Sequence, residues 1–223
     1  VEVISGQTNA FQEFSEFGMR FSANLETGQK TGFFLDQKDL RQEIIKLAKG
    51  RNVLNLFSYT GAHGVAALLG GASQVTHVDS SEPALAQSQT LQSLNGLSDR
   101  PSEIICADAF QWAAAQDASV YDMVILDPPG LIKSKNDIAG GQKAYHFLNR
   151  AALRLLKPGG ILVSSSCSHF LPEEDLRYIL RRASVQTEQH VHPIKTVTQS
   201  PDHPWSLYFP ESLYLKTLIA LVQ

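Results

Sequence analysis

Residues 53–69 have the sequence VLNLFSYTGAHGVAALL, in which a short apolar run passes through a glycine into a stretch of small side chains. The run from Val53 to Phe57 fits a buried strand, and the residues from Gly61 to Leu69 fit a helix. A strand followed at once by a helix is the repeating unit of folds built on a parallel sheet. This stretch therefore predicts an α/β protein.

The same alternation continues along the chain. Further helices are expected at 83–94, 109–115, 143–156 and from residue 172, and further strands at 74–79, 103–106, 121–126 and 161–165. Residues 157–160, KPGG, should end the third of these helices before the next strand. Two final strands, 191–197 and 214–222, flank a proline-rich loop. We expect a doubly wound, Rossmann-like α/β fold with a mainly parallel seven-stranded sheet and helices on both faces.

An aromatic-rich segment precedes this region. Phenylalanines at 11, 14, 17 and 21 alternate with polar residues, and glycines at 18, 28 and 32 interrupt the pattern. Such a pattern indicates one or two hairpins, and a helix should follow at 38–49. We therefore divide the chain into a β-hairpin extension, residues 1–35, and a main domain, residues 36–223.

Composition excludes several classes of protein. The 223 residues include 19 Lys and Arg against 22 Asp and Glu, a net charge of −3, and 43% are hydrophobic. These values are ordinary for a globular protein and exclude a disordered chain. No apolar run approaches the roughly 20 residues of a membrane span, so we expect no membrane partner. Cys106 and Cys167 make neither a disulfide framework nor a zinc site, so we expect no metal and a cytoplasmic location. The chain begins at Val1 without Met or a secretory leader, from which we expect that another segment precedes it.

The first three predicted strands lead to Gly61, Asp79 and Asp108. Ligands of such sheets bind outside the carboxyl ends of the strands, where Asp79 can accept ribose hydroxyls and Asp108 can meet an adenine edge. The glycine spacing excludes a P-loop and matches a dinucleotide fingerprint poorly. The simpler alternative is that the glycines serve packing and Asp79 caps a helix. The ordered set favours a nucleotide-like cofactor.

The next two strand ends carry different chemistry. Asp127, Pro128 and Pro129 form a stiff turn whose carboxylate suits an exocyclic amine on a planar base. The fifth strand ends beside that turn in Ser-Cys-Ser-His, residues 166–169, which makes Cys167 a candidate nucleophile. The simpler alternatives are a strand terminator and an inert buried cysteine, and the second is our interpretation of Cys106.

Five motifs, taken in order, resemble those of class I S-adenosylmethionine-dependent methyltransferases: NLFSYTG at 55–61, VDSS at 78–81, LDPP at 126–129, LKPGGIL at 156–162 and SCS at 166–168. With QKTGFFLDQ at 29–37 and PDHP at 201–204, the chain is similar, more narrowly, to the ribosomal RNA large subunit methyltransferase I family. That family makes 5-methylcytosine in 23S rRNA.

The resemblance implies S-adenosyl-L-methionine as cofactor and gives each matching residue a role. The methionine end would be bordered by residues 31–37, including Phe34 and Asp36. The methionyl and ribose parts would be lined by Asn55, Phe57, Ser58, Tyr59, Thr60 and Gly61. Asp79 with Ser80 would hold the ribose, and Asp108 with Ala109 the adenine. Asp127, beside the donor, would bind the target cytosine, and Cys167 would attack it. RNA contacts would come from Pro128, Pro129, Lys133 and Lys135.

The resemblance also implies partners. The expected substrate is 23S rRNA, and a homodimer is left open. Family members carry an N-terminal RNA-binding domain of the PUA type, which is missing from this sequence. Gly130 stands where the family usually has Lys or Ala. Two other functions stay open: methylation of a base nitrogen without the cysteine, and a module that binds the cofactor without chemistry.

Overall fold

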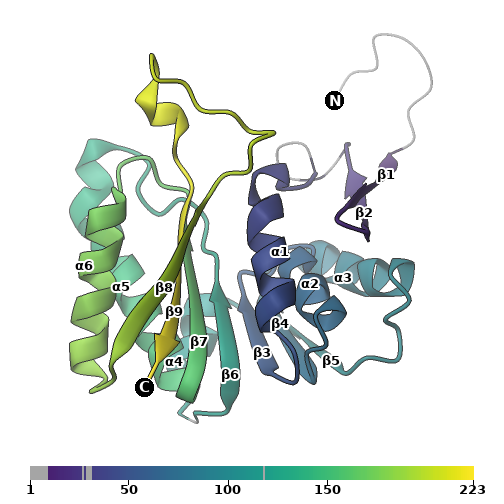
Figure 1. The fold of residues 1–223 in the computed structure, drawn as a ribbon, viewed down its shortest axis with the longest axis horizontal. Helices are drawn as coiled ribbons and strands as arrows, with labels where there is room; N and C mark the ends of the chain where they lie inside the picture. The colour runs from purple at the N-terminus through teal and green to yellow at the C-terminus, as the bar shows by residue number, and fades with distance from the viewer. Residues whose placement is uncertain (1–9, 27, 29–31, 118) are drawn as a thin grey trace.

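The computed structural model describes residues 10–26, 28, 32–117 and 119–223. Its centre is a seven-stranded sheet with the order β5-β4-β3-β6-β7-β9-β8 (Figure 1). Neighbouring strands from β5 to β7 are parallel, whereas β9 runs antiparallel to both β7 and β8. The strands are β3 (Asn52–Leu56), β4 (Gln74–Asp79), β5 (Ser102–Cys106), β6 (Tyr121–Leu126), β7 (Leu156–Ser166), β8 (Val191–Thr198) and β9 (Lys216–Val222). The mainly parallel seven-stranded sheet predicted from the sequence is confirmed.

Helices cover both faces of the sheet, so the fold is doubly wound (Figure 1). One layer contains α1 (Lys38–Leu47), α2 (Ala62–Leu69) and α3 (Glu82–Leu94), and the other contains α4 (Ala109–Ala115), α5 (Ile138–Leu155) and α6 (Glu173–Gln186). Each layer shares one hydrophobic core cluster with the sheet. Single 3-10 turns lie at η1 (Leu35–Gln37), η2 (Lys135–Asp137) and η3 (Pro210–Ser212).

Two element boundaries around α5 differ from the prediction. The helix begins at Ile138 rather than near Lys143, because Gly140 and Gly141 lie inside its first turns and conceal its start. A Cβ on Gly141 would collide with the side chain of Ile132, so that glycine permits close packing. The helix ends at Leu155, as expected, but β7 begins at Leu156 rather than at 161, so residues 157–160 do not separate the helix from the strand. Those residues form the irregular first part of β7, where Gly159 has a φ of +81°.

The N-terminal hairpin is present as β1 (Phe11–Glu16) and β2 (Met19–Asn24). Its turn, Phe17 and Gly18, has positive φ at both residues, which is the backbone of the tightest hairpins. Met19 and Phe21 point into the core cluster that also contains Ile44 of α1. The hairpin thus shares a core with the rest of the chain, and the division at residue 35 stays a prediction.

None of the helices in the described residues is both long enough and apolar enough to cross a membrane.

Candidate functional site

The strands β3, β4, β6 and β7 are adjacent, parallel and end at one edge of the sheet. The segments that follow them surround a cavity, together with the residues just before α1. Its lining consists of Phe33, Phe34, Asp36, Gln37, Arg41, Phe57, Ser58, Tyr59, Thr60, Ala62, His63, Asp79, Ser80, Ser81, Asp127, Pro128, Pro129 and Cys167.

The loop from β3 to α2 has an unusual backbone. Phe57 and Tyr59 have φ angles of 58° and 48°, and Gly61 has a φ of 79°. The left-handed region costs a residue with a Cβ about 1–2 kcal/mol, so two such residues in one loop need support from their surroundings. The backbone N–H of Tyr59 donates to Asp79 Oδ2 over 2.8 Å, which ties the loop to the end of β4.

Asp79 joins two loops at the cavity wall. Besides the bond from Tyr59, its Oδ1 accepts a hydrogen bond from the backbone N–H of Ser81 over 2.9 Å. The N-cap of α3 is Ser81, whose hydroxyl accepts from Ala84 N, so Asp79 is not the helix cap. Each carboxylate oxygen keeps a second lone pair that a ligand hydroxyl can use.

The two glycines of the loop face protein rather than the cavity. A Cβ on Gly61 would lie 2.5 Å from Ser88 Cβ, and one on Gly64 would lie within 2.2 Å of His77 Cε1. These contacts agree with the simpler alternative, that the two glycines serve packing. Burial lowers the pKa of His77 to about 4, so this ring is neutral at pH 7.

Asp127 lies at the end of β6 in a polar environment. Its Oδ2 accepts a hydrogen bond from Gln37 Nε2 over 2.5 Å. His63 Nδ1 lies 4.0 Å from the same oxygen. Burial lowers the pKa of His63 to about 3, so the ring is neutral and this contact is not an ion pair at pH 7.

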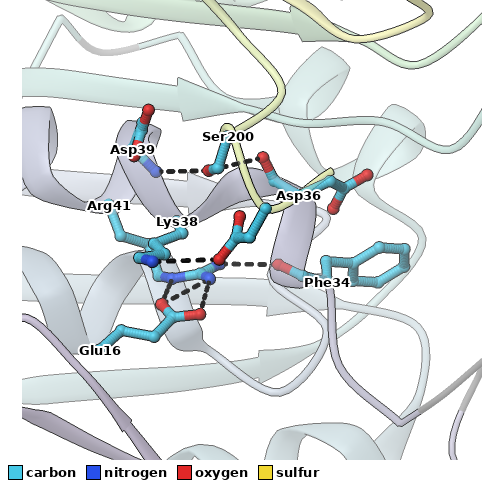
Figure 2. Close-up of polar contacts among 8 residues, drawn as sticks. Glu16, Phe34, Asp36, Lys38, Asp39, Arg41 and Ser200 are labelled. Atoms are coloured by element: carbon cyan, nitrogen blue, oxygen red, sulfur yellow. Dashed lines mark hydrogen bonds and ion pairs between the residues drawn. The ribbon is translucent and has the colours of Figure 1, made fainter. Parts of the chain in front are cut away.

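Arg41 is the most deeply buried cation at the cavity wall. It forms a bidentate pair with Glu16 of β1, with Nε–Oε2 and Nη2–Oε1 distances of 2.8 and 2.7 Å, and donates from Nη1 to the carbonyl of Phe34 (Figure 2). The guanidinium also lies over the ring of Phe33, 4.7 Å from its centroid. Burial lowers the pKa of Arg41 and raises that of Glu16, and the pairing opposes both changes. The hairpin is therefore connected through Arg41 to the segment that enters the cavity.

Asp36 is held from the C-terminal side of the chain. Its backbone carbonyl accepts hydrogen bonds from the N–H and the hydroxyl of Ser200 (Figure 2), and its Oδ2 accepts one from the Tyr214 hydroxyl over 2.5 Å. Within the described residues, Asp36 Oδ1 is buried with no hydrogen-bond partner. Burial, together with the Asp36 carboxylate, raises the pKa of Tyr214 well above its ordinary value, so the phenol stays a donor.

Cys167 is partly exposed and lines the same cavity as Asp127. The two residues follow neighbouring parallel strands, in which Leu126 pairs with Ser164. The sequence-based interpretation of Cys106 as buried is wrong, because its side chain is exposed at the end of β5, with the thiol directed at the carbonyl of Ser80.

The chain matches the model of the S-adenosylmethionine-dependent methyltransferase family over residues 1–205. It belongs to this family. Two relatives named "Ribosomal RNA large subunit methyltransferase I" are similar to it. The relative from Serratia proteamaculans is 40% identical, with 96% of this chain and 55% of the relative covered. The one from Photobacterium profundum is 37% identical, with 99% and 56% covered. The chain thus spans just over half the length of these relatives.

Solved structures of methyltransferases have the same fold. A candidate S-adenosylmethionine-dependent methyltransferase from Streptococcus mutans matches with a TM-score of 0.85 and 27% identity, over 98% of this chain and 57% of that one. A second candidate methyltransferase, solved in complex with SAH, also has a TM-score of 0.85, at 28% identity over 98% of this chain and 58% of the other.

The cavity fits the S-adenosylmethionine on which the family depends. Four buried polar atoms of its lining have no hydrogen-bond partner within the described residues: Asp36 Oδ1, Gln37 Oε1, Ser58 Oγ and His63 Nε2. Buried polar groups rarely stay unpaired, because each loses its hydration without compensation. A zwitterionic, hydroxyl-bearing molecule such as this donor supplies partners of the required kind.

The structure brings together most of the residues selected from the sequence. The cavity is lined by Phe34, Asp36, Phe57, Ser58, Tyr59, Thr60, Asp79, Ser80, Asp127, Pro128, Pro129 and Cys167. It is not lined by Asn55, Gly61, Asp108, Ala109, Lys133 or Lys135. Asn55 is buried in β3, Asp108 caps α4 by accepting from Gln111 N, and both lysines are exposed beyond β6. Thr31, at the start of the segment expected at the methionine end, lies outside the described residues.

Sequence reasoning missed Arg41, Ala62, His63 and Ser81 as lining residues, whereas Phe33 and Gln37 lie in the segment 31–37 that was expected there. For Arg41, the sequence did contain a signal that it is buried and paired. It lies on the buried face of α1 between Leu40 and Ile44, and a charge at such a position requires a buried partner. The identity of that partner, Glu16, could not be read from spacing.

Proposed function

We propose that this protein methylates carbon 5 of a cytosine in 23S rRNA, with Cys167 as the nucleophile. The observation that carries the proposal is that Cys167 and Asp127 line one cavity with Asp36 and Asp79. The names of the related proteins support ribosomal RNA as the substrate.

The donor would be held by residues around the loop after β3. Asp36, with its unpaired Oδ1, would accept a hydrogen bond from the donor's ammonium group, and Asp79 would accept from the ribose hydroxyls. When bound, S-adenosylmethionine supplies an electrophilic methyl group. The other steps depend on the side chains of this chain and on the base.

Cys167 would make the base reactive. Carbon 5 of cytosine is a weak nucleophile, but addition of a thiolate to carbon 6 turns the ring into an enamine whose carbon 5 can accept a methyl group. Loss of the proton from carbon 5 then expels the thiolate and restores the ring. Covalent catalysis of this kind divides one difficult step into two easier ones.

Asp127 would hold the base during addition. Its carboxylate lies on a turn stiffened by Pro128 and Pro129, and accepts a hydrogen bond from Gln37. A second bond, from the exocyclic amine of cytosine, would fix the ring over Cys167 and stabilise the charge that develops during addition.

The target base must leave its stack or be presented in a loop to enter this cavity. Lys133 and Lys135 are exposed after the turn and are available for phosphate contacts. The net charge of −3 provides no general attraction to RNA, so local cations of this kind would be needed.

Trapping with 5-fluorocytosine RNA tests the proposal. Fluorine at carbon 5 replaces the proton whose loss completes turnover, so the covalent complex should accumulate. The full-length protein with S-adenosylmethionine should form an adduct that survives denaturation, and Cys106→Ser should form it equally well. Cys167→Ser should not form it.

Two results would support the alternatives. If Cys167→Ala methylates 23S rRNA at the normal rate, the protein acts on a base nitrogen without the cysteine. If the intact protein binds S-adenosylmethionine but never methylates unmodified 23S rRNA, the cavity is a binding module.

A further inference from the structure

The three residues at the end of β7 face alternate directions. Ser166 and Ser168 are buried, with 0% and 2% of their surface exposed, whereas Cys167 between them is partly exposed and lines the cavity. Alternation is the natural geometry of extended backbone, but Cys167 lies just beyond the last ladder pair of β7 with β9, Ser166 with Lys216. Side-chain contacts must therefore maintain its direction.

The two serines meet a tyrosine hydroxyl beneath the cysteine. Ser166 Oγ donates to Tyr145 Oη over 2.9 Å, and Tyr145 Oη lies 3.0 Å from Ser168 Oγ. The backbone N–H of Ser168 donates to Ser166 Oγ over 3.2 Å. Tyr145, from α5, has none of its surface exposed. We call these three residues, Tyr145, Ser166 and Ser168, the hydroxyl cluster.

The hydroxyl cluster also reaches the turn that carries Asp127. Ser168 Oγ accepts a hydrogen bond from the backbone N–H of Ile132, five positions after Asp127, over 3.2 Å. The carbonyl of Ser168 accepts one from Lys216 Nζ over 2.6 Å. Ser168 therefore connects β7 to the segment after β6 and to β9.

The contact between the two segments is close. A Cβ placed on Gly130 would lie 3.6 Å from both Cys167 Sγ and Ser168 Oγ. The turn after Asp127 thus packs directly on the cysteine, and any movement of Ser168 would change the separation of thiol and carboxylate.

We propose that Tyr145 is a positioning residue for the reaction, whose hydroxyl fixes Cys167 relative to Asp127 through Ser166 and Ser168. This inference rests on the proposed function, in which those two groups act on one base. Tyr145 does not line the cavity, so it acts through the serines and does not touch the substrate.

Removal of the hydroxyl should slow chemistry and leave donor binding unchanged. Tyr145→Phe keeps the ring in the core, and a misplacement of about 1 Å at a reacting group can cost about 100-fold in rate. In the full-length protein, we expect the rate of adduct formation with 5-fluorocytosine RNA and the kcat for methylation to fall at least about 10-fold. The Kd for S-adenosylmethionine should stay within about twofold of the wild-type value, because the lost contacts act on the reaction and not on ground-state binding.

Tyr121→Phe is the matched control. Tyr121 is a second buried tyrosine, at the opposite end of β6 from Asp127, so its substitution tests the loss of a buried hydroxyl elsewhere in the same sheet. An adduct rate for Tyr145→Phe within about twofold of wild type, or a fall equal to that of Tyr121→Phe, would overturn the inference.

A double-mutant cycle tests the connection through Ser168. Because both residues act in one cluster, Tyr145→Phe with Ser168→Ala should be about as slow as the slower single variant. Independent, additive losses would contradict the inference. Ser168→Ala alone decides the matter by the same criteria if Tyr145→Phe does not fold.

A failure of the proposed function can be told apart from a failure of this inference. If the proposed function is wrong, the wild-type protein forms no adduct. The readout is then the rate at which iodoacetamide alkylates Cys167 in a Cys106→Ser background. An unchanged rate in Tyr145→Phe overturns the positioning role, and a change of more than about threefold supports it.

Discussion

The Nε2 of Gln37 donates a hydrogen bond to Oδ2 of Asp127 over 2.5 Å, and so connects the segment before α1 to the turn after β6 across 90 residues of sequence. Gln37 also has a buried Oε1 with no partner in the described part of the chain. The amide therefore contacts a group on the base side of the cavity and keeps one acceptor for a ligand. Gln37 is therefore shared by the donor side and the base side of the proposed site.

Gln37→Glu should introduce a pH dependence. Two carboxylates at this distance cannot both stay ionised cheaply, so the pKa of the pair rises in the folded state. Stability conferred by the shared proton is present at low pH and is lost as the pH rises through that pKa. We expect the free energy of unfolding, measured in urea, to fall relative to wild type as the pH rises from about 4.5, near the unfolded pKa of a carboxyl group, to about 8. Gln111→Glu, on the exposed side of α4, should show no such fall, and equal profiles for the two variants would contradict the assignment.

Glu16→Gln should be strongly destabilising. It leaves the buried guanidinium of Arg41 without its counterion, and loss of one partner of a buried pair typically costs about 3–5 kcal/mol. Chemical denaturation gives the free energy. The control is Glu13→Gln on the same hairpin, which breaks the exposed pair with Arg20 and should cost about 0–1 kcal/mol. Similar losses of unfolding free energy in both variants would show that the buried pair contributes no more to stability than the exposed pair.

Acid should weaken the fold through His77. Its pKa is about 4 in the folded protein against about 6.5 when unfolded, so between these values the unfolded state binds more protons. Stability is lost as the pH falls from 6.5 toward 4, by up to about 3 kcal/mol for this residue. The difference in unfolding free energy between pH 7 and pH 4.5 should shrink in His77→Met. It should not shrink in His190→Gln, whose ring is exposed.

Alanine should have opposite effects at two glycines that both lie third in a helix. In Gly64→Ala the new Cβ collides with His77, at a cost of about 1–3 kcal/mol. Gly140→Ala in α5 meets open space, so the reduced entropy of the unfolded chain should stabilise it by about 0.4–1 kcal/mol. Thermal unfolding should shift down for the first variant and up for the second. A rise in the unfolding temperature of Gly64→Ala would mean that β4 moves readily to make room for the new methyl group.

The strand ends could be predicted because parallel topology alone brings them together. Alternating apolar runs placed Asp79, Asp127 and Cys167 at one edge, and the strand order then put the last two beside each other. Contacts between distant segments could not be predicted in this way. The partner of Arg41 lies 25 residues earlier in another element, and the tyrosine that meets Ser166 and Ser168 lies on a helix whose register no strand pattern determines.

The loop from β3 to α2 shows what the sequence did not predict at a single site. The sequence predicted a nucleotide-like cofactor beside Gly61, yet the absent side chains at Gly61 and Gly64 make room for Ser88 and His77. The residues that line the cavity there are instead Ser58, Tyr59 and Thr60, and Tyr59 itself adopts the left-handed backbone. The motif thus predicted a loop that does border the cavity, without specifying which of its residues line that cavity.

The shared core of the hairpin has a practical consequence for making shortened versions of this protein. A truncation that starts at residue 36 would strip Met19, Phe21 and Phe33 from the apolar faces of Leu40 and Ile44 and would leave Arg41 charged and uncovered. Such a product should precipitate during expression. A soluble fragment for crystallisation should therefore keep both strands of the hairpin.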